Sequence, residues 1–354
     1  MSAILDDARI FKQYDSQDML AHIGKMPWQC RQAWQMALDY DLPTDYADVD
    51  KVIILGMGGS SIGGNLVGSL ISGEAKVPVI VNHDDNLPAF VDSRTLVIAS
   101  SYSGNTEEIL SAFDSALKTD CKKLVITAGG KLKAAAEKKD IPVFSFSYKS
   151  QPRAALSFSL LPLLCFLQKL GFIGDKVADV AETAQVLQGI SHKMNEQVPS
   201  QSNPAKQLAQ DLRGKLPVIY GAGYLAEVAR RWKTQLNENS KAWAFHEVFP
   251  ELNHNAVVGY QFPVELADRI KVVMLRSPLL PQRIQRYYQV AGELLEQAKV
   301  GYKVLDGEGS SSLSQMMSLI MFGDYVSCYL AVLNKVDPSP VEAIDYLKRK
   351  LSKD

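Results

Sequence analysis

Short runs of apolar, often β-branched residues alternate with helix-like stretches, and this alternation constrains the fold more than any other feature of the sequence. In the first half of the chain, helical stretches such as 107–117 and 132–138 separate the runs. Strands that alternate with helices of this length predict a parallel, doubly wound β-sheet. The predicted strands of this first sheet are 51–55, 77–81, 95–99, 123–127 and 141–146.

The second half of the chain repeats this architecture, although its residues do not repeat those of the first half. Helices are predicted at 224–236 and 282–299, and two further helices, 313–333 and 341–351, close the chain. The predicted strands are 216–220, 241–245, 270–275 and 301–305. We therefore predict an α/β fold with two doubly wound parallel-sheet domains and with N-terminal and C-terminal helices.

The pattern also predicts where the domains begin and end. Pro152 is a normal start signal for a helix, and the polar, proline-containing stretch 197–204 marks a junction. The expected segments are an N-terminal helical segment (1–50), a first sheet domain (51–152), connecting helices (153–200) and a second sheet domain with the C-terminal helices (201–354).

Composition argues against several classes of function. The formal net charge is −1, so electrostatics give no reason to expect DNA or RNA as a partner. The four cysteines form no CxxC pair and have no histidine at metal-ligand spacing, which suits small core residues in a reducing compartment. The N-terminus does not resemble a secretory signal, and the longest apolar run, 156–167, is too short to span a bilayer. We expect a cytoplasmic protein without metal, cofactor or membrane partner.

A glycine-rich loop follows the first predicted strand, where residues 56–61 read GMGGSS. Such a turn before a helix places backbone N–H groups at one point and suits an anion. A dinucleotide site is an alternative, because Gly56 and Gly58 begin a GxGxxS pattern and His83-Asp84 lies near the end of the next strand. A tight turn that binds no ligand is the other alternative.

A second loop, rich in hydroxyl groups, follows the predicted strand 95–99 and reads SSYSGNTEE over residues 100–108. The carboxyl edge of an open parallel sheet is where ligands bind, and Ser101, Ser103 and Thr106 can donate hydrogen bonds to a phosphate. No lysine follows at Walker spacing, which argues against a nucleoside triphosphate. Asn105 or Thr106 could instead simply cap the helix. Two such loops side by side favour a monophosphate over a dinucleotide.

Four further residues are candidates for chemistry. Glu238, between two asparagines at the predicted end of a helix, could act as a general base or be a solvated surface acid. His254, in the polar segment 250–255, could be catalytic or structural, and His246 competes with it from the alternating stretch 243–248, which reads as a strand. Arg153 opens a helix where a cation gains nothing from the helix dipole, so it either binds an anion or is a surface residue. Lys348 lies on the last helix, and composition alone favours a solvated position.

Together these segments resemble the sugar isomerase (SIS) domain superfamily, and in particular the bifunctional phosphoglucose/phosphomannose isomerase family. The resemblance covers nearly the whole chain, and NENSK followed by PELNHN is its most specific part. The matching segments are GMGGSS (56–61), SYSGNT (101–106), QPR (151–153), NENSK (237–241), PELNHN (250–255) and DPSPVEAIDYLK (337–348).

The resemblance implies a role for each candidate residue. Glu238 would move a proton between C1 and C2 of the sugar, and Arg153 would stabilise negative charge near these carbons. His254 would help to open the ring, and Lys348 would lie at the ring oxygen or on the phosphate side. The family has its active site at a homodimer interface, with the histidine contributed across it. The apolar stretch 160–170 and the terminal helices are also expected to need partners, which agrees with a homodimer. The residues expected to bind the sugar phosphate are Gly59, Ser60, Ser101, Ser103 and Thr106.

The chemistry that the family implies agrees with these residue types. Metal-free aldose–ketose isomerisation needs one carboxylate to carry the proton through a cis-enediol, an acid for ring opening, a cation near the oxyanion and a phosphate site. Two alternatives stay open. A non-catalytic sugar-phosphate sensor would keep the two loops and lack the base, and an aminosugar or hexulose phosphate isomerase of the same superfamily normally lacks the NENSK and PELNHN pair.

Overall fold

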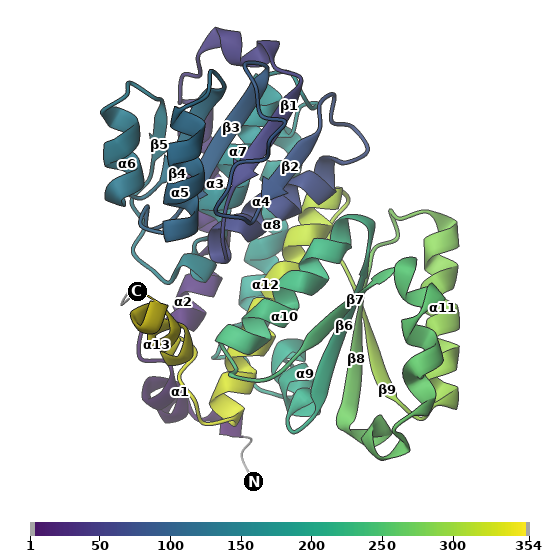
Figure 1. Cartoon of the computed structure of the whole chain (residues 1–354). Coiled ribbons are helices and arrows are strands. Elements are labelled where there is room, and N and C mark those ends of the chain that lie inside the picture. The colour runs from purple at the N-terminus through teal and green to yellow at the C-terminus, as the bar shows by residue number, and fades with distance from the viewer. Residues whose placement is uncertain (1–3, 352–354) are drawn as a thin grey trace.

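The computed structural model describes residues 4–351, and these form two parallel β-sheets with helices on both faces of each (Figure 1). The first sheet has the strand order β2-β1-β3-β4-β5, and every neighbouring pair is parallel. The predicted five-stranded, doubly wound sheet is therefore confirmed. Its strands are β1 (Lys51–Leu55), β2 (Val79–Asn82), β3 (Thr95–Ser101), β4 (Lys122–Thr127) and β5 (Val143–Ser145).

The second sheet has the order β7-β6-β8-β9 and is also parallel throughout. This order matches the first four positions of the first sheet, so the repeat of architecture without repeat of sequence is confirmed. Its strands are β6 (Leu216–Ala222), β7 (Phe245–Phe249), β8 (Ile270–Arg276) and β9 (Gly301–Asp306).

One predicted strand, 241–245, is wrong. β7 begins only at Phe245, and the residues before it form a turn that ends the preceding helix. Lys241 has a left-handed φ of 52°, and the Asn237 side chain donates to the carbonyl of Ala242 at 2.8 Å. These local bonds satisfy the end of the helix, and they prevent the apolar pattern around Trp243 from joining the sheet earlier.

Alternate side chains of the first sheet pack on two separate helix layers. Ile53, Leu55, Val97 and Val125 contact α5 (Glu107–Leu117) and α6 (Gly130–Glu137) on one face. Residues one position along these strands pack in the main core on the other face. The helices of that face are α3 (Met26–Leu38), α4 (Gly59–Ile71) and α7 (Leu156–Lys169). This period-two alternation is what a sheet buried on both sides requires.

A long apolar helix, α12 (Ser312–Leu333), lies at the centre of the molecule (Figure 1). It packs on α8 (Val177–Met194), α9 (Pro204–Leu212) and α10 (Ala226–Glu238). Among the described residues it is the one helix long and apolar enough by composition to cross a membrane, and 94% of its most apolar window is buried inside the protein. Its apolar surface is therefore covered by other helices of the same chain.

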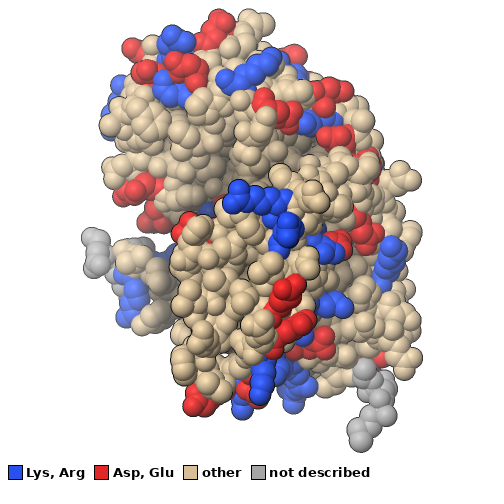
Figure 2. All heavy atoms as spheres, turned by 90° about the vertical axis from the view of Figure 1, so that its right-hand side faces the viewer, with Lys and Arg blue, Asp and Glu red and all other residues tan. Residues whose placement is uncertain are grey.

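Four helices complete the two ends and the second sheet. The N-terminal segment contains α1 (Ala8–Tyr14) and α2 (Met19–Gly24), and α11 (Gln282–Gln297) covers β8 and β9 on the face opposite α10. The last helix, α13 (Glu342–Leu351), lies outside both sheets at the left of Figure 1 and buries none of its residues. On the face shown in Figure 2, lysines and arginines are interspersed with aspartates and glutamates, and uncharged side chains cover broad areas.

The packing corrects one part of the sequence analysis. The apolar stretch 160–170 was expected to need a partner subunit, but α7 is buried within one chain against α3 and α4. α12 is likewise buried, whereas α13 is the terminal helix that leaves apolar side chains exposed. These are Ile344, Tyr346, Leu347 and Leu351.

Candidate active site

The two predicted ligand loops lie side by side at the carboxyl edge of the first sheet. The backbone N–H of Tyr102 donates to Ser60 Oγ at 3.0 Å and joins the first turn of α4 to the loop after β3. Ser101 Oγ accepts from the N–H of Gly104 at 3.1 Å and lies 3.2 Å from Thr106 Oγ1. Ser60 and Ser101 are buried, while Ser103 is exposed. The structure therefore brings together the hydroxyl groups singled out in the sequence.

A close approach of two backbones fixes the shape of the second loop. Gly104 has a φ of 64°, and a Cβ atom there would lie 1.8 Å from the carbonyl oxygen of Gly129. Only glycine tolerates both the left-handed conformation and this contact. Thr106 stands at the N-cap of α5 but makes no capping hydrogen bond to the helix. The first N–H groups of α5 are thus left without a side-chain cap.

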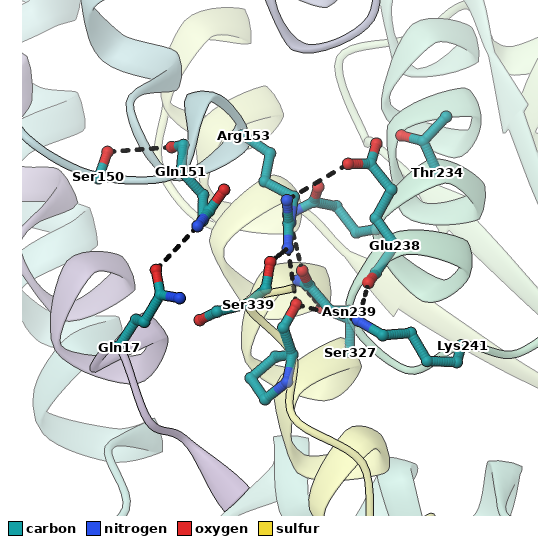
Figure 3. Close-up of polar contacts among 12 residues, drawn as sticks. Gln17, Ser150, Gln151, Arg153, Thr234, Glu238, Asn239, Lys241, Ser327 and Ser339 are labelled. Atoms are coloured by element: carbon teal, nitrogen blue, oxygen red, sulfur yellow. Dashed lines mark hydrogen bonds and ion pairs between the residues drawn. The ribbon is translucent and has the colours of Figure 1, made fainter. Parts of the chain in front are cut away.

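Arg153 is a buried cation whose contacts are mostly with uncharged oxygens (Figure 3). It lies in a 3-10 turn, η3 (Pro152–Ala154), just before α7, and it is only 4% exposed. Its Nε donates to Asn239 Oδ1 at 2.6 Å, and its Nη2 donates to the carbonyls of Pro338 and Ser339 at 2.6 and 2.8 Å. Burial lowers the pKa of the guanidinium, and the charge of Glu238 opposes this shift. A cation held in this way keeps much of its charge available for an anion.

Glu238 faces Arg153 from the second domain. It is the last residue of α10, and its Oε2 lies 3.4 Å from Arg153 Nη1 (Figure 3). Lys241, three residues later, donates from Nζ to the carbonyl of Glu238 at 2.6 Å. Burial, and then repulsion by Arg153, lowers the pKa of Lys241. A carboxylate, a buried guanidinium and a second cation therefore meet at the end of one helix.

A groove of about 1020 Å³ opens beside this cluster. Glu238 and Lys241 line it together with Trp243 and the beginning of α13. The cluster also adjoins the phosphate loops, because a Cβ atom on Gly59 would lie 3.4 Å from the backbone nitrogen of Arg153. The candidate site is thus a single region between the carboxyl edge of the first sheet and the end of α10.

His254 lies away from this region within one chain. It belongs to η5 (Glu251–His254), which follows β7 at the carboxyl edge of the second sheet. Glu238 lies at the opposite edge, because α10 begins after β6 and runs back along the sheet. The five residues of β7, at about 3.3 Å each, separate the two edges. His254 is exposed and does not reach Glu238 of its own chain.

The remaining candidates are distributed around the site. Lys348 is exposed on α13, four residues beyond Ile344, which lines the groove. His246 lies in β7, as expected, and burial lowers its pKa. The sequence analysis predicted no role for Asn239 and Lys241, although both belong to NENSK (237–241), a segment that carries the family resemblance. In residues 4–351 no group of three or more histidine, cysteine, aspartate or glutamate side chains is arranged to hold a metal ion.

Comparison with known proteins identifies the class. Residues 201–351 match the family model described as the bacterial phospho-glucose isomerase C-terminal SIS domain. The structure is similar to that of a hypothetical protein from Thermus thermophilus, with a TM-score of 0.74 at 16% identity, over 98% of this chain and 92% of that chain. Two parallel sheets with hydroxyl-bearing loops at the carboxyl edge define a protein of the sugar isomerase domain class.

Two relatives identify the family within this class. The chain is 44% identical to a bifunctional phosphoglucose/phosphomannose isomerase of Caldicellulosiruptor bescii, over 94% of this chain and 99% of that protein. It is 33% identical to an enzyme of the same name from Aquifex aeolicus, over 88% of this chain and 94% of the relative. The chain belongs to the bifunctional phosphoglucose/phosphomannose isomerase family.

Proposed function

We propose that this chain is a metal-independent aldose–ketose isomerase that interconverts glucose 6-phosphate and mannose 6-phosphate with fructose 6-phosphate. The observation that carries the proposal is the meeting of Glu238 and buried Arg153 at 3.4 Å, beside two loops suited to a phosphate. The names of the relatives support the same substrates.

The phosphate is bound by Gly59, Ser60, Ser101, Ser103 and Thr106 in this proposal. Support comes from the uncapped N–H groups at the start of α5 and from the hydroxyl groups gathered there. The Ser60 Oγ lone pair that accepts from Tyr102 is used within the protein, but its hydrogen is free to be donated. Ser60 therefore both joins the loops and can contact the phosphate.

Glu238 acts as the base that carries a proton between C1 and C2 of the open-chain sugar. Removal of the proton gives the cis-enediolate form of the enediol, with negative charge on oxygen, and the Nη1 edge of Arg153 lies where it can stabilise that charge. Such a site needs no metal, because the carboxylate transfers the proton and the guanidinium supplies the positive charge.

We propose further that the active protein is a homodimer in which His254 reaches the partner's site and opens the sugar ring. Two exposed apolar surfaces support this. The segment after His254 exposes Val258, Phe262 (77%) and Val264, and the groove beside Glu238 exposes Trp243 (80%). If the segment after His254 of each chain packs on the groove of the other chain, the two chains form a closed, two-fold dimer with two equal sites. Lys348 then lies near the ring oxygen or the phosphate, on a helix that has no buried face of its own.

Four unpaired, buried cysteines agree with a reducing compartment, and we propose a cytoplasmic location. The near-zero net charge agrees with a small-molecule substrate rather than a nucleic acid.

The deciding experiment is a coupled assay on glucose 6-phosphate, mannose 6-phosphate and fructose 6-phosphate without added metal. Turnover of all three supports the proposal. Binding without turnover indicates a sugar-phosphate sensor. An aminosugar phosphate and a hexulose phosphate other than fructose 6-phosphate are assayed in parallel, and turnover of either of these alone indicates another isomerase of the class.

A further inference from the structure

Arg153 and Glu238 do not form the close ion pair that arginine and a carboxylate ordinarily adopt. Their separation is 3.4 Å, whereas charge-assisted N–H···O bonds usually measure about 2.7–2.9 Å and are often bidentate. A few residues earlier on α10, Arg231 does form such a bond, to Asp324 at 2.6 Å, and both side chains are buried. The long contact at Arg153 therefore has a specific cause.

Uncharged acceptors hold the guanidinium back. Arginine has five N–H donors, and three of those on Arg153 point to oxygens without a formal charge. Two of these acceptors are the backbone carbonyls of Pro338 and Ser339, and the third is the side chain of Asn239. This leaves Nη1 as the edge that faces Glu238 (Figure 3).

The Asn239 side chain is itself fixed. It is fully buried, and its Nδ2 donates to Ser327 Oγ on α12 at 2.9 Å. Ser327 Oγ donates in turn to the carbonyl of Asp324 at 2.7 Å, so it can only accept from Asn239. The amide oxygen of Asn239 must then face Arg153 Nε, which is a donor only. The hydrogen-bond chain from α12 thus determines the orientation of the amide.

We propose that Asn239 is a positioning residue, which holds Arg153 so that its guanidinium cannot close onto Glu238. The inference rests on the proposed function, in which Glu238 is the base and Arg153 the cation. A close ion pair would occupy the carboxylate oxygens that must accept a proton, and it would cancel the charge meant for the enediol oxygen. Asn239 keeps both groups available without touching the substrate.

Truncation of Asn239 should therefore reduce catalysis in a characteristic way. In Asn239→Ala, Arg153 Nε loses its acceptor and the guanidinium rotates towards Glu238. We expect kcat to fall by about 10–100-fold with KM changed by less than about threefold, because the phosphate loops are untouched. The acid limb of the kcat/KM profile should move to lower pH by about one unit, because a close cation favours the ionised carboxylate.

A double-mutant cycle separates this role from a general loss of structure. Arg153→Lys keeps a positive charge and removes the Nε group that Asn239 holds. In that background Asn239→Ala should reduce kcat by no more than about twofold, because its target is gone. Ser240→Ala is the matched control, since it removes a buried hydrogen bond from the same helix end to the backbone carbonyl of Ser327 and keeps both the Ser327 hydroxyl and Arg153 unchanged. It should retain kcat within about threefold and leave the acid limb in place.

The outcomes distinguish the inference from the proposed function. The role of Asn239 would be overturned if Asn239→Ala lowered kcat equally in the native and Arg153→Lys backgrounds, or if it left the acid limb in place. The role of Glu238 as the base would still be supported in that case by an inactive Glu238→Gln enzyme. Normal turnover by Glu238→Gln would overturn the proposed function itself. Should Asn239→Ala fail to fold, Ser327→Ala loosens the same amide from its other end. It should then shift the acid limb in the same direction by a smaller amount, and no shift would overturn the inference.

Discussion

Arg153 and Glu238 meet at 3.4 Å although 85 residues separate them in the sequence and they come from different halves of the chain. Arg153 stands in the turn that leaves the first sheet, and Glu238 ends α10, the helix that follows β6 in the second sheet. Neither half contains both the candidate base and the candidate cation. The relative position of the two sheets is therefore a requirement of the proposed chemistry.

The first prediction concerns Glu238. Glu238→Gln keeps the shape and hydrogen-bonding capacity of the side chain and removes the proton acceptor. We expect turnover of glucose and mannose 6-phosphate to fall together by about 10²–10⁴-fold, because one enediol serves both substrates. Substrate affinity, measured by calorimetry, should change little, since the phosphate loops lie in the other domain.

A second, partly buried glutamate on the same helix provides the comparison for this variant. Glu227→Gln changes the first turn of α10, more than two turns from Glu238, and should keep near-normal turnover. A folded Glu238→Gln enzyme with turnover within a few-fold of the native protein would end the proposed mechanism, even with the fold and phosphate loops intact.

The second prediction concerns the phosphate loop. Thr106→Val removes the hydroxyl group that contacts Ser101 and should raise KM by about 10–100-fold, the effect of losing one hydrogen bond to a charged group. Inorganic phosphate should inhibit the variant less strongly than the native enzyme. Thr119→Val makes the same change just beyond the other end of α5 and should leave KM unchanged. Equal KM values for both variants would remove Thr106 from the site.

The third prediction tests the shared site by subunit mixing. Glu238→Gln and His254→Ala proteins should each be nearly inactive on ring-closed substrate. In an equal mixture after subunit exchange, about half of the dimers are mixed, and each of these has one site with both native residues. Activity should therefore recover to about one quarter of the native value. No recovery in a mixture shown to exchange subunits would place both residues in the site of one chain.

The fourth prediction is a pH dependence of stability. Burial lowers the pKa of His22, whose Nδ1 lies 2.7 Å from the hydroxyl of Tyr148, and Lys25 acts in the same direction. Below the ordinary pKa of about 6.5 the unfolded chain binds the proton more readily than the folded protein. The contribution of neutral His22 is thus complete above that pH and is lost as the pH falls through the lowered pKa.

His22→Gln should remove this part of the acid sensitivity. Between about pH 7.5 and about pH 5.5 the native melting temperature should fall by about 1–3 °C more than that of the variant. His83 and His246, whose pKa values burial also lowers, act identically in both proteins and cancel in the difference. A greater acid loss in the variant than in the native protein would contradict the assignment.

Local patterns predicted the fold almost completely. β1 and α5 begin and end at the predicted residues, because a buried apolar strand and an acid-rich helix start are both local signals. The false strand at 241–245 shows the limit of such signals, since the turn after α10 depends on side-chain bonds from Asn237. The domain boundaries and the roles of the site residues stay predictions.

The candidate site was harder to predict for a physical reason. Glu238 and Arg153 were found through residue type and family resemblance, and no sequence pattern predicted that they would meet. The sequence did not indicate Asn239, because its proposed role depends on contacts with Ser327 on α12 and with Arg153, which are 88 and 86 residues away. The expectation that the apolar segment 160–170 needs a partner subunit was wrong, because α7 is buried against other helices of the same chain.

The position of α12 has a consequence for how the protein is made. This helix begins at Ser312, yet it packs on α1 and α2 near the N-terminus as well as on α8, α9 and α10. A ribosome therefore synthesises all of these helices before it synthesises α12, the helix that joins them. Until then the nascent chain exposes the apolar surfaces that α12 will cover, and these are the surfaces that chaperones recognise. We expect newly made chains to depend on chaperones until α12 has been synthesised, and a ribosome that stalls before this helix to leave an aggregation-prone product.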